Sequence, residues 1–271
     1  MSAPYRAQPI ADTIPSASAA LLAELAETEL VSARDVLAWR RTTGRGPLVP
    51  APALTILTLD RTLFDVARRR FRGRSRDGLA GELLTLGRTG HRVGVFGCPG
   101  MGAPAMAIAV EELTALGATA LIAVGTAGAL TADLAPTTVI VATGALRDEG
   151  VSGHYLPPGP TVEASAELTG QVIDGLRAVG IATRSGLSWT TDACYRETRT
   201  ALVRARARGA LVVEMEAAAL FAVGRRRGIR TAAVLVVADS LAREPWQGPT
   251  DPGSVQDTLA AVLGALVGLR P

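Results

Sequence analysis

Two acidic residues lie inside an otherwise apolar stretch of the sequence. Glu214 and Glu216 flank Met215 in the run 211–223. A carboxylate in such surroundings has a large desolvation cost unless hydrogen-bond donors reach it, and its two oxygens suit the two hydroxyls of a vicinal diol. Because acids are favoured at a helix start, we expect Glu214 to face water there and Glu216 to be the buried, ligand-binding carboxylate.

A third acid, Asp239, follows the apolar run 232–238 and is expected at the carboxyl end of a strand. Its alternative role is that of a helix N-cap. The glycine-rich segments 97–102 and 125–128 would let backbone N–H groups approach an anion or the edge of a heterocycle. They would equally serve as tight turns without a ligand. Neither has the spacing of the dinucleotide fingerprint, so no nicotinamide cofactor is expected.

Strand and helix patterns alternate along most of the chain. We predict strands at 54–59, 92–96, 120–124, 139–143, 184–190, 212–213 and 231–237, and helices at 62–70, 105–116, 164–179, 213–226 and 254–269. This alternation predicts an α/β protein, a single-domain three-layer α/β/α fold around a central mixed, largely parallel sheet. Ligand sites in such folds lie in loops at the carboxyl ends of strands, here 97–102, a turn at 125–128, 192–197 and 237–240.

The segment before the first strand has a different character. Residues 1–13 are expected to be a loose arm, and apolar residues from 21 to 39 are spaced for one or two helices that open at Pro15 and Ser16. The glycines and prolines between 44 and 52 separate this extension from the rest of the chain. We therefore divide the protein into an N-terminal arm and helical extension, residues 1–50, and a main domain, residues 51–271.

Composition excludes several classes of protein. The 271 residues are 48% hydrophobic and 20% charged, which suits one sizeable core and excludes disorder and coiled coil. Cys98 and Cys194 cannot form a disulfide framework, no Cys/His cluster has metal-ligand spacing, and no apolar run is long enough for a membrane span. We expect a cytoplasmic protein with no bound metal and no membrane association.

All 28 basic residues are arginine, and they outnumber the 25 acidic residues by only three. Arginine is thus the one cationic side chain that could hold a phosphate or a carboxylate. Six arginines gather between 68 and 76, where we expect a solvated helix end and turn rather than a nucleic-acid site.

Taken together, the motifs resemble those of the nucleoside phosphorylase and nucleosidase superfamily, which contains hexameric purine nucleoside phosphorylases, uridine phosphorylases and methylthioadenosine nucleosidases. The resemblance covers about residues 54–246. It is carried, in order and spacing, by 100–102 followed by 109–117, then 124–129, 213–219 and 237–240. Residues 51–271 would accordingly form the catalytic domain of such an enzyme.

The resemblance implies roles for individual residues at the sugar and at the base. Glu216 would accept hydrogen bonds from the ribose 2′- and 3′-hydroxyls, and Met215 would pack under the sugar. Asp239 would protonate or hydrogen-bond N7 of a departing purine, which is otherwise a poor leaving group. The uridine phosphorylase branch lacks an aspartate at this position, so the base is expected to be purine-like. Ala127 and Gly128 would line it.

Further positions follow from the same resemblance. Gly102 belongs to the substrate-binding glycine loop, and Cys194 and Tyr195 fall where the family places aromatic side chains over base and sugar. Cys194 replaces the usual phenylalanine, which suggests an unusual or larger base. His154 matches the mobile entrance flap, with an ordinary surface histidine as its alternative. Thr126 matches a hydroxyl of the phosphate site.

The remaining phosphate-binding positions depart from the family pattern. The arginine of the first loop aligns with Leu63 and its glycine with Leu59, and two further arginine positions align with Ala123 and Ala80. A buried dianion without paired cations would be very costly, so we expect water rather than inorganic phosphate to be the nucleophile.

In the hydrolytic branch an acid on the first loop activates the water, and Asp60 or Asp65 could do so here. Their alternative roles are a helix cap for Asp60 and a surface helix residue for Asp65.

These observations favour an enzyme that hydrolyses the N-glycosidic bond of a purine-like nucleoside without any cofactor. The alternatives are a phosphate-dependent nucleoside phosphorylase, with inorganic phosphate as co-substrate, and a non-catalytic member that binds a nucleoside. The resemblance also implies a homo-oligomer, a dimer or hexamer.

Overall fold

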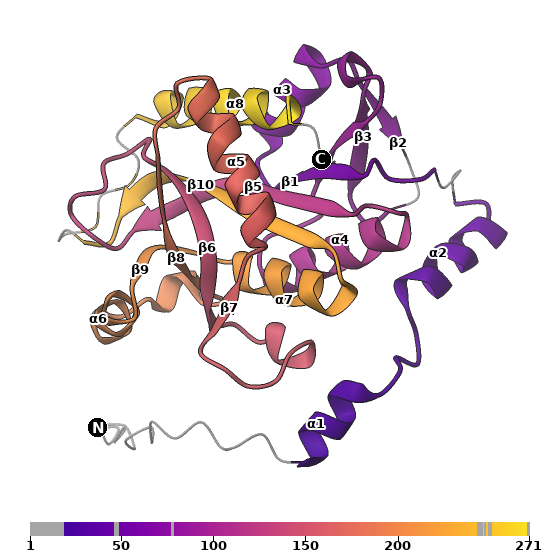
Figure 1. Ribbon diagram of the computed structural model, residues 1–271, viewed down its shortest axis with the longest axis horizontal. Helices are drawn as coiled ribbons and strands as arrows, with labels where there is room; N and C mark the ends of the chain where they lie inside the picture. The colour runs from indigo at the N-terminus through magenta and orange to yellow at the C-terminus, as the bar shows by residue number, and fades with distance from the viewer. Residues whose placement is uncertain are drawn as a thin grey trace, which may run out of the picture.

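The computed structural model describes residues 19–45, 49–76, 79–242, 246, 248 and 251–269 (Figure 1). The predicted loose arm and the residues expected to open the extension, Pro15 and Ser16, lie outside this part of the chain.

The described strands form one ten-stranded sheet. They are β1 (Leu54–Thr58), β2 (Gly73–Arg76), β3 (Glu82–Leu86), β4 (Val93–Gly97), β5 (Ala120–Ala129), β6 (Val139–Asp148), β7 (Thr161–Glu163), β8 (Thr183–Thr191), β9 (Ala210–Glu214) and β10 (Arg230–Ser240).

Strand β5 is the branch point of the sheet, because it pairs with β1, β9 and β10. The pairings of β10 with β6, β6 with β8, and β8 with β9 complete a closed ring of five strands. Beyond β1 the sheet continues as β4, β3 and β2. The ring brings the ends of β5, β8, β9 and β10 together, although these strands are far apart in the sequence.

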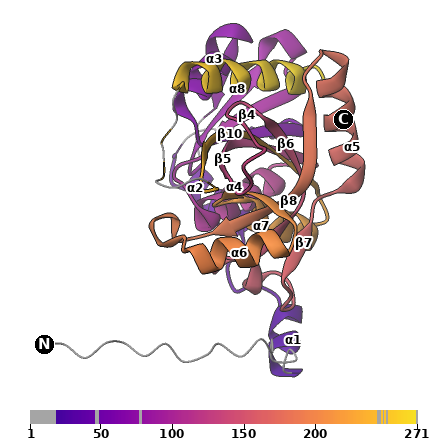
Figure 2. The same cartoon turned by 90° about the vertical axis from the view of Figure 1, so that its left-hand side faces the viewer.

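The predicted three-layer arrangement with a central mixed sheet is confirmed (Figures 1 and 2). Its described helices are α1 (Ala19–Ala26), α2 (Ala33–Thr42), α3 (Arg61–Arg70), α4 (Ala103–Ala115), α5 (Ala166–Ala178), α6 (Arg199–Ala207), α7 (Ala217–Arg227) and α8 (Pro252–Val267). Buried side chains of α3, α5 and α8 cover one face of the sheet, and those of α4 and α7 cover the other.

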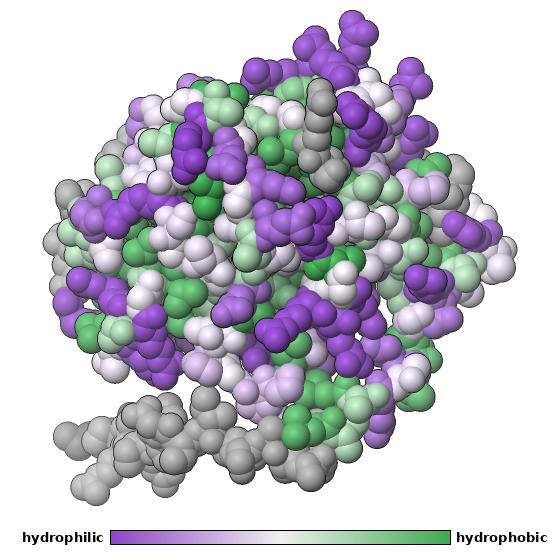
Figure 3. Space-filling view, viewed as in Figure 1, coloured by the Kyte–Doolittle hydropathy of each residue, from purple (hydrophilic) through white to green (hydrophobic). Residues whose placement is uncertain are grey.

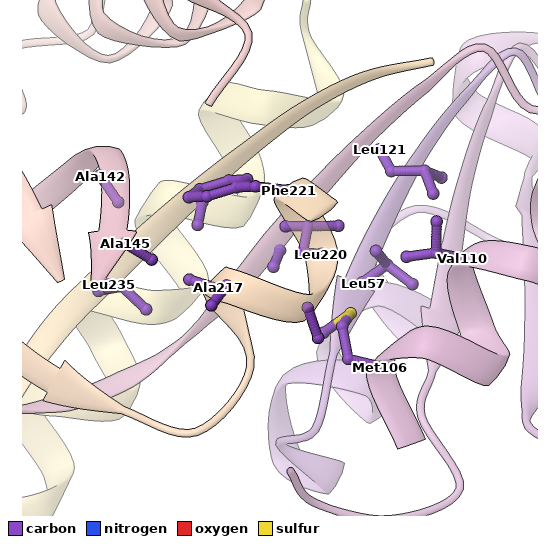
Figure 4. Packing of buried hydrophobic residues seen from close by; sticks show 14 of the residues in the cluster. Leu57, Met106, Val110, Leu121, Ala142, Ala145, Ala217, Leu220, Phe221 and Leu235 are labelled. Atoms are coloured by element: carbon purple, nitrogen blue, oxygen red, sulfur yellow. The ribbon is translucent and has the colours of Figure 1, made fainter. Parts of the chain in front are cut away.

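Helix α7 is buried on all sides over its first two turns. Every residue from Ala217 to Gly224 is buried, and the helix packs against α4 and the sheet through Leu220 and Phe221 (Figure 4). A helix that is apolar all round belongs in a core. Its alanines let the backbone lie close to β10 and β6, which fixes the position of the residues just before it.

The extension docks on α4 by ion pairs. Glu112 is 4% exposed, and it accepts hydrogen bonds from Arg40 Nη1 on α2 at 2.8 Å and from the Ala80 N–H at 2.7 Å. Its neighbour Glu111 pairs with Arg227, which also reaches Glu29 of the extension. Helix α1 lies apart from the sheet, and apolar groups gather over this edge of the molecule (Figures 1 and 3).

The sequence prediction of a turn at 125–128 is wrong. These residues continue β5, because their backbone pairs with β10, and at Gly128 also with β9. The sheet is also less parallel than expected, with five parallel and five antiparallel pairings among the described strands.

Four elements were missed from the sequence, namely β2, β3, β7 and α6. The arginine run is only partly a helix end. Arg68 lies in the last turn of α3, but Arg74 and Arg76 lie on the edge strand β2 rather than in a turn. Hydrophilic side chains project from this side of the molecule (Figure 3). Among the described helices, none is long and apolar enough to cross a membrane.

The Arg40–Glu112 pair should contribute measurably to stability. The Arg40→Ala variant leaves one oxygen of the buried Glu112 carboxylate without this donor, which should lower the free energy of unfolding by about 1–3 kcal/mol. Urea denaturation would measure the loss. Arg41→Ala, at an exposed position of the same helix, is the matched control. Equal stability of the two variants would contradict the importance of this contact.

Candidate functional site

Glu216 lies between the end of β9 and the first residue of α7. Its Oε1 accepts a hydrogen bond from the Gly102 N–H at 2.7 Å, and its Oε2 accepts a longer one from the Met215 N–H at 3.3 Å. Gly102 has φ +90°, a conformation that suits glycine and that directs its N–H toward the carboxylate. Burial, together with the charge of Glu214, raises the pKa of Glu216 to about 7.

Glu214 is buried, and our expectation that it faces water is wrong. It is the last residue of β9, and its carboxylate accepts hydrogen bonds from Thr190 Oγ1 at 2.5 Å, the Glu216 N–H at 2.7 Å and the Ala217 N–H at 2.6 Å. Burial raises its pKa despite these donors. Glu214 therefore caps the start of α7 from inside and fixes the turn on which Glu216 stands.

Asp239 lies at the other end of the site, near the end of β10. The register of β10 against β5 shifts between Val237 and Asp239, and such an irregularity re-aims a side chain. Asp239 Oδ2 accepts a hydrogen bond from Trp246 Nε1 at 2.7 Å. A Cβ on Gly128 would lie 3.2 Å from Asp239 Oδ1 and 2.7 Å from Leu241 Cδ1, so a larger residue would require these side chains to move.

These residues line two adjoining pockets. The first, here called the Asp239 pocket, has a volume of about 690 Å³ and is lined by Ala127, Gly128, Cys194, Tyr195 and Asp239, among others. The second, the Asp60 pocket, has a volume of about 310 Å³ and is lined by Asp60, Met101, Gly125 and Glu216, among others. Thr126, Glu214 and Met215 line both pockets, so the two form one cleft.

The two candidate acids of the first loop occupy different places. Asp60 lines the same pocket as Glu216, and it is also the N-cap of α3, since its Oδ1 accepts the Leu63 N–H at 2.8 Å. Its Oδ2 accepts Gln256 Nε2 at 2.6 Å. Asp65 lies one turn along α3, 3.8 Å from Arg61, and does not line either pocket. The structure therefore brings Asp60, and not Asp65, to the cleft.

His154 also lies away from the other candidates. It ends a short 3-10 helix, Ser152–His154, and lines a separate pocket together with Glu29 and Arg227. Cys194 and Tyr195, by contrast, are exposed on the 3-10 helix Cys194–Arg196 at the mouth of the Asp239 pocket.

No arginine is found among the described residues that line the Asp60 pocket. Leu59 and Ala123 line it instead, and Leu63 is fully buried. Ala80, at another position where the family has an arginine, donates its backbone N–H to Glu112. Arg61 is the arginine nearest in sequence to Asp60. It lies on the surface of α3 and approaches Asp65 and Glu82.

Several residues of the cleft were not identified from the sequence. Glu197 and Trp246 line the Asp239 pocket, Thr190 holds Glu214, and Gln256 reaches Asp60 from α8. Glu197 lies in the loop 192–197, so its position at the end of a strand was the available signal. Gln256 is 196 residues from Asp60, and no local pattern relates the two. In the described part of the chain no group of three or more His, Cys, Asp or Glu could hold a metal ion.

Comparison with known proteins identifies the family. The family model described as the phosphorylase superfamily matches residues 57–267. The chain therefore belongs to the phosphorylase superfamily.

Relatives in this family include nucleoside phosphorylases. The chain is 37% identical over 146 residues to a guanosine phosphorylase of Halorubrum lacusprofundi, a match that covers 52% of this chain and 59% of the relative. It is 35% identical over 182 residues to a uridine phosphorylase of Treponema pallidum, covering 63% of this chain and 70% of the relative. The first match thus spans less than two thirds of that relative's length.

Solved structures share the fold. The AMP nucleosidase from Bacteroides thetaiotaomicron superimposes with a TM-score of 0.68 at 21% identity, covering 86% of this chain and 96% of that one. The purine nucleoside phosphorylase from Toxoplasma gondii in complex with immucillin-H superimposes with the same TM-score at 21% identity, covering 80% and 90%. At this identity the likeness concerns the fold.

The raised pKa of Glu216 predicts a cost in stability. Its pKa is about 7 in the folded chain and 4.5 in the reference state, so folding favours the protonated form. The stabilising effect is complete below about pH 4.5 and is lost as the pH rises through about 7. The Glu216→Gln variant does not titrate there, so its unfolding free energy relative to the wild type should increase by on the order of 2 kcal/mol between about pH 5 and pH 8.

Thermal and urea denaturation of both proteins at several pH values would measure this difference. Glu163→Gln, at an exposed position on β7, is the matched control and should not reproduce the effect. A pH-independent difference between Glu216→Gln and wild type would contradict the assignment.

Proposed function

We propose that this protein hydrolyses the N-glycosidic bond of a purine-like nucleoside, with water as the nucleophile and without a cofactor. The observation that carries the proposal is the composition of the cleft. It contains carboxyl groups suited to a sugar and a departing base, while no arginine lines the described part of the Asp60 pocket.

The sugar would be held by Glu216. An ionised carboxylate accepts hydrogen bonds from both hydroxyls of a ribose, and Met215 would pack against the ring from the same turn. The Gly102 and Met215 N–H groups support the orientation of this carboxylate. Such fixed charge also stabilises the positive charge that develops on the sugar as the bond breaks.

The base would occupy the Asp239 pocket. Asp239 would donate a proton to N7 as the base leaves, which lowers the barrier to bond cleavage. Ala127, Gly128, Cys194 and Tyr195 line this pocket, and its volume of about 690 Å³ is sufficient for a purine. His154 lines a separate pocket, so we assign it to an entrance loop and not to direct contact with the base.

Water would lie in the Asp60 pocket beside Asp60. The two donors to this carboxylate, the Leu63 N–H and Gln256 Nε2, fix its position and leave lone pairs that can accept a proton or orient a water molecule. A bound phosphate dianion would need paired cations in the same space. The guanosine and uridine phosphorylases among the relatives make phosphorolysis the rival reaction.

We further propose that the enzyme acts as a homo-oligomer in the cytoplasm, with residues 51–271 as its catalytic domain and residues 1–50 as an extension.

The choice between hydrolysis and phosphorolysis can be tested by product analysis. The purified protein, incubated with adenosine, guanosine, inosine and uridine, should release free ribose from a purine nucleoside in phosphate-free buffer. Chromatography of base and sugar products would show this. Strict dependence on phosphate, with release of ribose 1-phosphate, would contradict hydrolysis.

Variants of the three acids test their roles. Asp239→Asn should lower kcat by about a hundredfold or more, because the side chain can no longer donate its proton. Asp60→Asn keeps an acceptable helix cap but should also lower kcat. Asp65→Asn is the matched control on the same helix, and should keep wild-type activity. Full activity of Asp60→Asn, or loss in Asp65→Asn, would contradict the assignment of the water-activating acid.

A further inference from the structure

Two carboxyl groups line the same pocket of the cleft. Asp239 reaches the Asp239 pocket from β10, and Glu197 reaches it from the loop that follows the 3-10 helix Cys194–Arg196. Glu197 is partly buried. Within the described residues, neither carboxyl group forms an ion pair with an arginine.

The two carboxyl groups have unequal surroundings. The Trp246 indole N–H donates to Asp239 Oδ2 at 2.7 Å. Glu197 accepts no hydrogen bond from the described side chains that line the pocket. Burial, and secondly the negative charge of Asp239, raise the pKa of Glu197 to about 7. Glu197 therefore keeps a proton closer to neutral pH than an exposed glutamate does.

Other titratable groups also line this pocket. They are Cys194 and Tyr195 on the 3-10 helix, Arg199 and Arg206 on α6, and Glu214 at the end of β9. Arg199 has an interaction of its own, and Glu214 is occupied by Thr190 and by the backbone of the α7 start. The arginines would favour an ionised Glu197, but burial and the charge of Asp239 act in the opposite direction and prevail.

We propose that Glu197 is a positioning residue for acid catalysis, which holds the proton that Asp239 delivers to the departing base. This inference rests on the proposed function. In the step, the N-glycosidic bond breaks and its electron pair goes to the base, which takes a proton from Asp239. Glu197 passes its proton to Asp239 within the pocket, and solvent reprotonates Glu197 before the next turnover.

The pH dependence of kcat/KM on a purine nucleoside tests the proposal. The wild-type enzyme should lose activity above about pH 7, because the pair then loses its proton. In Glu197→Gln the pocket lacks the carboxyl group that holds a proton near neutral pH, so the alkaline limb of the profile moves to lower pH. Activity at about pH 7 should fall by about tenfold and recover toward about pH 5. Glu197→Asp should restore part of it.

A substrate that needs no proton separates this role from simple base binding. A purine nucleoside methylated at N7 already carries a positive charge on the leaving base. Glu197→Gln should therefore cleave it at the wild-type rate, as should the control Glu163→Gln. Thermal unfolding of each variant would verify folding.

Three outcomes would overturn the inference. An unchanged alkaline limb in Glu197→Gln would show that the proton does not come from this residue. Equal losses on the N7-methylated and ordinary nucleosides would assign Glu197 to base binding or to structure. A wild-type protein that cleaves no nucleoside would overturn the proposed function itself, and this inference with it.

Discussion

The burial of the Glu214 carboxylate is the constraint on which the site depends. A buried carboxylate must be surrounded by donors, and here two of them are backbone N–H groups of the turn between β9 and α7. Satisfying Glu214 therefore fixes the backbone of Glu216 and the start of α7. Thr190 contributes from β8, and its hydroxyl oxygen also accepts the Ala218 N–H. One side chain thus joins two strands and a helix at the point where Glu216 enters the cleft.

The same turn shows how this fold accommodates an unfavourable ionisation. Glu216 is buried close to Glu214, and within the described part of the chain two backbone N–H groups donate to it, which is not enough to prevent a rise in its pKa. A ribose would supply the hydroxyl donors that the protein withholds. In the free protein, ionisation of this carboxylate near neutral pH therefore lowers stability. Residues suited to a ligand commonly reduce the stability of the protein without it.

The sequence predicted much of the fold because strong local patterns determine it. The buried strands β1, β5 and β10 and the helices α4, α5 and α8 have apolar patterns whose bounds were predicted to within a few residues, apart from the carboxyl-terminal parts of β5 and β10. The segment 125–128 was misassigned since glycine commonly marks turns, whereas here Gly128 lies in a strand, where the side chains of Leu241 and Asp239 approach its backbone closely. That approach depends on the pairing of β5 with β10, and no pattern in the sequence near residue 128 indicates it.

The site was predicted where residues act through their own chemistry, and missed where they act through distant partners. Glu216 and Asp239 could be selected because acids interrupt apolar runs. Glu214 could not be assigned correctly, because its donors include Thr190 on another strand. Gln256 was missed for the same reason. Its role follows from its hydrogen bond to Asp60, which forms because α8 carries Gln256 to the start of α3.

The closed ring of strands has a consequence for how the protein is made. Arg230 pairs with Ala120, so the contact between β5 and β10 joins residues 110 positions apart, and such non-local pairing forms slowly. Until β10 has left the ribosome, the edge of β5 that it covers stays open and Asp239 is absent from the cleft. The Asp239 pocket can therefore form only after all the other described strands of the sheet have been translated.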